Sequence, residues 1–121
     1  MTTSRQALGR WGEAIAAEFL ENQGYFIIER NRRTPYGEID LVAQDGAVLV
    51  FVEVKTRTSD AFGFPEESIT SQKREHLISA AQAILQSMSN RPNLWRIDVI
   101  AIRKVKFAER PEIVHFKNAV N

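Results

Sequence analysis

The sequence predicts an α/β fold in which helices flank a mixed central β-sheet. Two stretches with helical periodicity alternate with apolar, β-prone runs, so the expected order of elements is α-β-β-β-α-β-β. The chain has 121 residues, about the length of one ordinary domain. We therefore expect residues 1–121 to form a single domain whose sheet is covered on both faces.

Two segments show the spacing of amphipathic helices. The first is expected at residues 4–23, with apolar residues at spacings of three and four: Leu8, Trp11, Ile15 and Phe19. Gly24 follows where a helix commonly ends in a left-handed residue. The second helix is expected at about residues 69–89, with a buried stripe formed by Leu77, Ala81, Ile84, Leu85 and Met88.

Turn-forming residues separate the expected strands. An Asp45-Gly46 pair, which favours a tight hairpin, joins two of them. Residues 31–37 are polar and are expected to form a loop, and residues 58–67 are expected to form a second loop over one end of the sheet. The strands are expected at 25–30, 38–44, 47–57 and 94–104, with a final edge strand at 112–116.

Composition excludes several classes of protein. The formal net charge is only +1, so whole-chain charge does not by itself predict a nucleic-acid partner. The absence of cysteine excludes disulfides and thiolate metal sites. No apolar run approaches the ~20 residues of a membrane span, and the N-terminus lacks the apolar block of a secretory signal. We therefore expect a cytoplasmic protein with no membrane partner.

Charged residues interrupt two neighbouring apolar strands. Asp40 lies in the first strand, and Glu53 and Lys55 share one face of the second. A two-residue turn at the aspartate-glycine pair places Glu38 opposite Glu53, with Asp40 diagonal to Glu53. All four charged side chains then lie on one face of the sheet. A slip of one residue would separate them, so this prediction depends on the turn.

Two carboxylates about 4 Å apart repel by roughly 4 kcal/mol at an effective dielectric of 20, so a fold that keeps them together needs a compensating charge. Oxygen ligands suit a hard divalent cation, Mg²⁺ or Mn²⁺, and Lys55 can orient water or stabilise a phosphate nearby. The alternative is that the acids face solvent and Lys55 pairs with one of them. We favour the cation site because the neighbouring residues are apolar on both faces.

Glu13 is a candidate third carboxylate. At 100° per residue it lies beside the apolar stripe of the first helix, near Gly9 and Gly12, and can reach the edge of the sheet. The alternative is an ordinary solvated glutamate on the flank of the helix.

These motifs resemble a nuclease signature. Asp40, twelve residues, then Glu53-Val54-Lys55 is similar to the pattern of the restriction-endonuclease-like PD-(D/E)XK nuclease superfamily, and the helix with Glu13 resembles archaeal Holliday-junction resolvases. More narrowly, nearly the whole chain resembles the bacterial YraN family (UPF0102), in Gly9-x-x-Gly12-Glu13, Gly37-Glu38-Ile39-Asp40-Leu41-Val42-Ala43, Val52-Glu53-Val54-Lys55-Thr56-Arg57 and Arg96-Ile97-Asp98-Val99-Ile100-Ala101.

The resemblance implies a restriction-endonuclease-like fold and Mg²⁺- or Mn²⁺-dependent cleavage of phosphodiester bonds. It assigns metal binding to Glu13, Asp40 and Glu53, and it assigns catalysis to Asp40 and Glu53 together with Lys55. A chain this short lacks room for an extensive sequence-reading domain, which favours branched or flapped DNA as the substrate. The resemblance to resolvases also implies a homodimer, because such enzymes cut two symmetric strands. The alternative is a catalytically inactive nucleic-acid-binding module that retains the nuclease fold.

Several further residues are candidates for supporting roles. Glu38 replaces the proline often found near the superfamily aspartate, and it either joins the metal site or contacts a loop arginine. Lys73 begins the second helix and can approach the site or remain solvated, and Asp98 is expected to have a structural or supporting role. The basic residues that flank the site and can hold a nucleic-acid backbone, or simply face solvent, are Arg32, Arg33 and Arg57.

Overall fold

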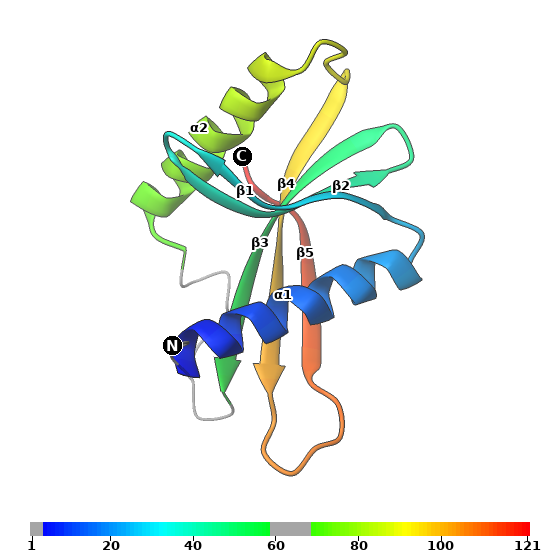
Figure 1. The fold of residues 1–121 in the computed structure, drawn as a ribbon, viewed down its shortest axis with the longest axis vertical. Coiled ribbons are helices and arrows are strands. Elements are labelled where there is room, and N and C mark those ends of the chain that lie inside the picture. Colours follow the sequence, from blue (N-terminus) through cyan, green and yellow to red (C-terminus); the bar gives the residue numbers. More distant parts are fainter. Residues whose placement is uncertain (1–3, 59–68) are drawn as a thin grey trace.

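A computed structural model describes residues 4–58 and 69–121, and its core is a five-stranded mixed β-sheet (Figure 1). The elements are α1 (Ser4–Asn22), β1 (Phe26–Thr34), β2 (Gly37–Asp45), β3 (Val48–Thr58), α2 (Ser71–Ser87), β4 (Leu94–Lys104) and β5 (Glu112–Val120). Within these two ranges, neither helix is long and apolar enough to cross a membrane. The loop predicted at 58–67 lies almost entirely outside the described residues.

The strands lie side by side in chain order, β1-β2-β3-β4-β5. Strands β3 and β4 are parallel because α2 carries the chain back between them, whereas the other neighbours are antiparallel. The strands fan out strongly, as the right-handed twist of sheets requires (Figure 1). The mixed sheet and the order α-β-β-β-α-β-β confirm the prediction.

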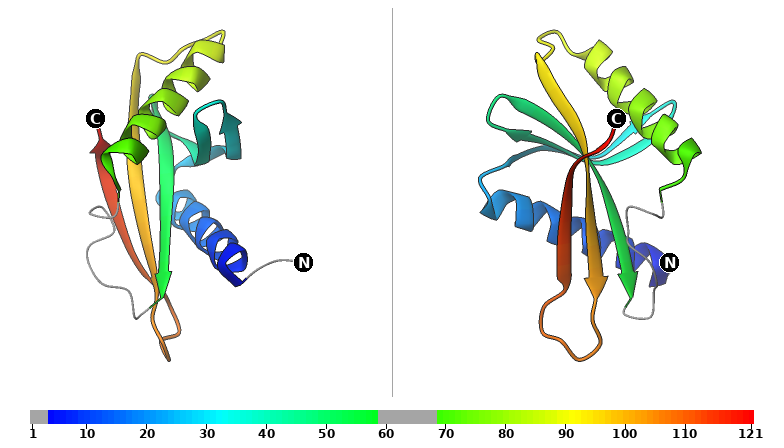
Figure 2. Two further views of the ribbon diagram at one scale, coloured as in Figure 1. Left: turned by 90° about the vertical axis from the view of Figure 1, so that its left-hand side faces the viewer. Right: turned by 180° about the vertical axis from the view of Figure 1, so that it is seen from behind.

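The two helices cover opposite faces of the sheet, as predicted (Figure 2). Side chains alternate along β3, so Leu49 and Phe51 pack in the core on the α2 side. Val50 and Val52 pack in a second core on the α1 side. The odd-numbered residues that follow in β3 therefore face α2, which places Glu53 and Lys55 on that side.

Strand β1 is longer than predicted. Residues 31–34 continue the strand instead of forming a loop, because they pair with β2: Arg32 with Ile39, Arg33 with Glu38 and Thr34 with Gly37. The turn shrinks to Pro35 and Tyr36, and the Thr34 hydroxyl closes it by donating a hydrogen bond to Gly37 O at 2.7 Å. Because β1 is an edge strand with mostly exposed side chains, polar residues are tolerated there. Strand β5 likewise extends beyond its predicted end at residue 116.

The β2–β3 hairpin differs from the predicted register by two residues. Asp45 pairs with Val48, so the turn consists of Gly46 and Ala47. Gly46 has a φ of 60°, and glycine is favoured at this first position in type II′ hairpins. The ladder ends at the pair of Leu41 with Val52, so Asp40 and Glu53 lie just beyond the paired residues. An even shift keeps the side chains of the paired residues on their predicted faces.

Gly12 lets α1 approach β3 closely. A Cβ atom at this position would lie 1.9 Å from Thr56 Oγ1 and 2.9 Å from Thr56 Cβ. No side chain fits there unless the helix or Thr56 moves. Since Glu13 is the next residue, the close approach also fixes how near its carboxylate comes to the sheet.

The substitution Gly12→Ala should lower the free energy of unfolding by about 1–3 kcal/mol, because it overpacks the contact with Thr56. Gly9→Ala is the matched control: it lies in the same helix, and its Cβ would meet no atom within 4 Å. The control should be neutral or stabilising by up to ~1 kcal/mol, because alanine is the better helix former. Urea denaturation measures both, and equal effects would contradict the close approach.

Candidate metal centre

Asp40 links β2 to β3 at the point where their regular pairing ends. Its Oδ2 accepts a hydrogen bond of 2.8 Å from the backbone N–H of Val54. A side chain thus satisfies a strand donor that a main-chain carbonyl would normally satisfy. This bond holds the Asp40 carboxylate beside the backbone that carries Glu53 and Lys55.

Glu53 is a buried carboxylate with unequal surroundings at its two oxygens. Its side chain is only 7% exposed, and its Oε1 lies 3.7 Å from Lys55 Nζ and 3.5 Å from Lys73 Nζ. Its Oε2 is also buried but accepts no hydrogen bond from the described residues. An unsatisfied buried carboxylate oxygen is costly, and it leaves one ligand position open toward an ion or a substrate.

Both carboxylates of this pair resist ionisation. Burial, followed by the negative charge of Glu53, raises the pKa of Asp40 to about 7, against the opposing hydrogen bond from Val54. Burial also raises the pKa of Glu53, although Lys73 and Lys55 act in the opposite direction. We call Asp40 and Glu53 the carboxylate pair. A bound cation would relieve both effects by compensating the charge.

Glu13 reaches this region from α1, on the other face of the sheet. In the amide orientation that matches donors with acceptors, Asn31 donates to Glu13 Oε2 and to Glu38 Oε1, each at 2.9 Å. Burial and then the charge of Glu38 raise the pKa of Glu13, with a further contribution from Glu53. Asn31 has a left-handed φ of 53°, which asparagine tolerates better than most residues. Asn31 is not among the predicted site residues, because residues 31–37 have the composition of a polar loop.

The three predicted metal ligands interact electrostatically with one another, but they do not form a complete metal-binding site. Among the described residues, no group of three or more acidic, histidine or cysteine side chains is arranged to hold a metal ion. The carboxylate pair nevertheless fits a Mg²⁺ or Mn²⁺ ion, because such ions use one or two protein carboxylates and take further oxygens from water or phosphate. The unsatisfied Glu53 Oε2 supports this fit. Glu13 remains a predicted third ligand.

Two hollows flank the tip of the β1–β2 hairpin. The larger, about 590 Å³, lies on the α1 side, and Glu13, Asn31 and Glu38 line it together with Arg10 and Arg33. The smaller, about 70 Å³, is lined by Glu38 and by Lys73 and other residues of α2. Glu38 therefore borders both hollows. Its carboxylate lies 3.9 Å from Arg33 Nε, so the arginine contact predicted for Glu38 is present.

The predicted basic residues divide into two groups. Lys73 lies beside Glu53 as predicted, at the start of α2, where Thr70 caps the helix by accepting a hydrogen bond from Lys73 N. Arg32 does not join the site, because its guanidinium binds Glu29 at 2.8 Å and reaches Ser87 at the far end of α2. Arg33 lies in β1 and not in the predicted loop, and Arg57 lies in β3, within the strand predicted there.

Asp98 belongs to a separate buried network. It is fully buried, and it accepts hydrogen bonds from Arg96 Nε at 3.0 Å, His115 Nε2 at 2.7 Å and Asn118 N at 2.8 Å. Burial opposes its ionisation, but these bonds prevail and lower the pKa of Asp98. These contacts join β4 to β5 and agree with a structural role, one of the two predicted alternatives. His115 on β5 is one of its partners.

Comparison with known proteins supports the family resemblance that the sequence motifs indicate. Residues 12–102 match the model of a family described as Uncharacterised protein family UPF0102. A UPF0102 protein of Syntrophotalea carbinolica is 44% identical over 119 residues, which cover 98% of this chain and 95% of the relative. UPF0102 proteins of Dehalococcoides mccartyi and Roseiflexus castenholzii are 40% and 46% identical, and each alignment covers 99% of this chain and 98% of the relative. This chain therefore belongs to the UPF0102 family.

Proposed function

We propose that this protein is a Mg²⁺- or Mn²⁺-dependent endonuclease that hydrolyses phosphodiester bonds in DNA, with branched or structured DNA as the substrate class. The observation that carries the proposal is the buried carboxylate pair, in which Glu53 Oε2 lacks a hydrogen-bond partner and Asp40 is fixed by Val54. A purely structural role gives no reason to bury two carboxyl groups beside each other. A binding site for a hard cation gives such a reason, because the ion compensates their charge.

Each residue of the site has a distinct role in this proposal. Asp40 and Glu53 would hold the ion, assisted by Glu13 from the opposite face. The bound ion would supply Lewis-acid polarisation of the scissile phosphate. Lys55 lies 3.7 Å from Glu53 Oε1 and is 27% exposed, so its ammonium can donate a hydrogen bond to the attacking water or to a phosphate oxygen. Lys73 orients Glu53 from the α2 side.

The sequence resemblance supports the finer parts of the proposal. The order of elements and the mixed sheet are compatible with the restriction-endonuclease-like fold that the resemblance implies. The resemblance to archaeal Holliday-junction resolvases supports DNA as the partner and a homodimer as the working form. A cytoplasmic location, which the composition predicts, agrees with access to DNA.

The rival function is a nucleic-acid-binding module that has lost catalysis. One observation favours it: two ammonium groups already lie within 4 Å of Glu53 Oε1, at 3.7 and 3.5 Å, so the protein neutralises part of the charge without an ion. The module would bind DNA in a salt-dependent manner without cutting it. Cleavage assays distinguish the two functions.

The test is a panel of linear, flapped and four-way branched DNAs incubated with purified protein in Mn²⁺, Mg²⁺ or EDTA. We expect cutting in Mn²⁺ and none in EDTA. Lys55→Ala should reduce the rate by about 100-fold or more, because it removes a positioned donor from the reacting groups. Lys117→Ala, an exposed lysine on β5, is the matched control and should cut normally. Equal cutting by both variants would contradict the proposed role of Lys55, and absence of any cutting would favour the rival.

A further inference from the structure

The β4–β5 turn carries an unusually exposed aromatic residue. Phe107 is 95% exposed, and its φ of 66° lies in the left-handed region that bulky side chains seldom adopt. A hydrogen bond of 3.2 Å from Ala108 N to Val105 O closes the turn around it. Folding thus holds a large apolar ring in water on a strained backbone, which is a pattern typical of functional positions.

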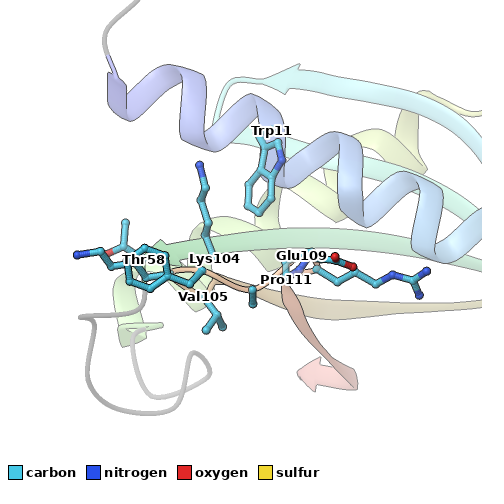
Figure 3. A pocket seen from close by; sticks show the side chains of 10 residues that line it. Trp11, Thr58, Lys104, Val105, Glu109 and Pro111 are labelled. Carbon is cyan, nitrogen blue, oxygen red and sulfur yellow. The ribbon is translucent and has the colours of Figure 1, made fainter.

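Basic and aromatic side chains surround this turn. A hollow of about 630 Å³ lies between the turn and α1, and Trp11 from α1 forms one wall (Figure 3). Lys104 Nζ lies 5.6 Å from the centre of the Trp11 ring, and Lys106 Nζ lies 5.3 Å from the centre of the Phe107 ring. Arg110 adds a third cation, and Glu109 is the one acid that lines the hollow among the described residues.

We propose that this turn and hollow bind single-stranded DNA, with an unpaired base stacked on Phe107 and the flanking phosphates held by Lys104 and Lys106. The excess of basic groups favours a polyanion. Every base has a π face that can stack on an exposed aromatic ring, whereas bases inside a duplex are already stacked. The ligand is therefore an unpaired segment and not a continuous duplex.

The hollow and the candidate metal centre lie at two positions along β3 and on opposite faces of the sheet. Thr58, the last residue of β3, lines the hollow on the α1 side, whereas Glu53 lies five residues earlier and faces α2. Five strand residues span roughly 16 Å along the strand. A branched or flapped DNA offers an unpaired strand that can extend from its junction to the hollow. The identification of the ligand as DNA rests on the proposed nuclease function.

Fluorescence anisotropy with a labelled single-stranded oligonucleotide in EDTA tests the contact without cleavage. Phe107→Gly removes the ring and relieves the backbone strain, so the protein should fold normally but bind single strands about 10-fold more weakly. Phe107→Trp should retain binding. Binding of a blunt duplex should change little in either variant. Phe26→Ala, which removes another exposed phenylalanine (69% exposed) from the β1 edge, is the matched control and should bind like the wild type.

The outcomes separate this contact from the nuclease activity. Weaker single-strand binding in Phe107→Gly supports the contact, even if no Mn²⁺-dependent cutting is found. Unchanged binding in Phe107→Gly, an equal loss on the duplex, or no single-strand binding by the wild type would overturn it, even if the protein cuts DNA. It would also be overturned if Phe107→Gly lost only binding to phosphatidylserine vesicles, because the turn would then contact membranes.

Discussion

The substitution Asp40→Asn should reduce Mn²⁺-dependent DNA cleavage by at least about 1,000-fold, because it removes one of the two carboxylates proposed to hold the ion. The same substitution should raise the free energy of unfolding in EDTA at pH 8, by roughly 2–4 kcal/mol. The asparagine carbonyl can still accept the hydrogen bond from Val54 N. Its amide group also replaces a negative charge beside Glu53 with a hydrogen-bond donor.

The sign of the pH dependence follows from the raised pKa of Asp40. Burial and the charge of Glu53 raise this pKa from 3.8 to about 7, so the folded state binds a proton more tightly than the unfolded chain. The resulting stabilisation is complete below about pH 4 and is lost as the pH rises through 7. In EDTA, the wild type should therefore be less stable at pH 8 than at pH 5, and Asp40→Asn should lose much less over this interval.

Urea denaturation at pH 5 and pH 8 measures this stability difference, and the DNA panel measures the loss of cleavage. Glu18→Gln, an exposed acid on α1, is the matched control and should change neither property. A variant that is both inactive and less stable than the wild type would indicate a structural role for Asp40 and would contradict the account.

The largest loss of stability is expected from Asp98→Ala. Asp98 is fully buried and joins Arg96, His115 and the backbone of Asn118, so its removal leaves buried donors without their acceptor. Loss of one partner from a buried ionic network typically costs about 3–5 kcal/mol. Arg96 also reaches Asp45 at 3.3 Å, but the Asp45 side chain is 41% exposed. Asp45→Ala is therefore the matched control, with an expected loss of about 1 kcal/mol or less.

Denaturation of these two variants by urea at pH 7 tests the network. The pKa of Asp98 is lowered despite burial, so its contribution is present above its ordinary value near 4 and is lost as the pH falls further. The wild type should accordingly lose stability below about pH 4, in the opposite direction to the effect of Asp40. Similar losses from Asp98→Ala and Asp45→Ala would show that the buried network contributes no more than a surface pair.

The sequence was enough to predict that Asp40 and Glu53 share one face of the sheet. It was not enough to predict which residues of β2 and β3 pair with each other. Alternation along a strand has a period of two, so any even shift leaves Asp40 and Glu53 on one face. The position of the turn was wrong because the Asp45-Gly46 pair suits several hairpins, and the choice of Gly46 and Ala47 depends on pairing along the whole hairpin. The strands and helices themselves were predicted to within a few residues, except at β1 and β5.

The contacts that cross the fold could not be predicted from local patterns. The Asn31 bridge joins residues 13 and 38, and the bond from His115 to Asp98 depends on a bulge in β5 near Asn118, whose φ is 51°. Neither contact produces a periodic pattern in the sequence. The composition of residues 31–34 does not distinguish a strand from a loop, because an exposed edge strand is as polar as a loop.

The central claim is that the carboxylate pair binds a divalent cation, and the most direct test is the thermal stability of the wild type and Asp40→Asn as Mn²⁺ is titrated at pH 8. An ion that binds only the folded protein stabilises it by about 2.7 kcal/mol at 100 times its Kd. The account predicts that the Tm of the wild type rises by several degrees with Mn²⁺ and that the Tm of Asp40→Asn, higher at the start, does not respond. A wild type that does not respond, or a variant that responds equally, would contradict it.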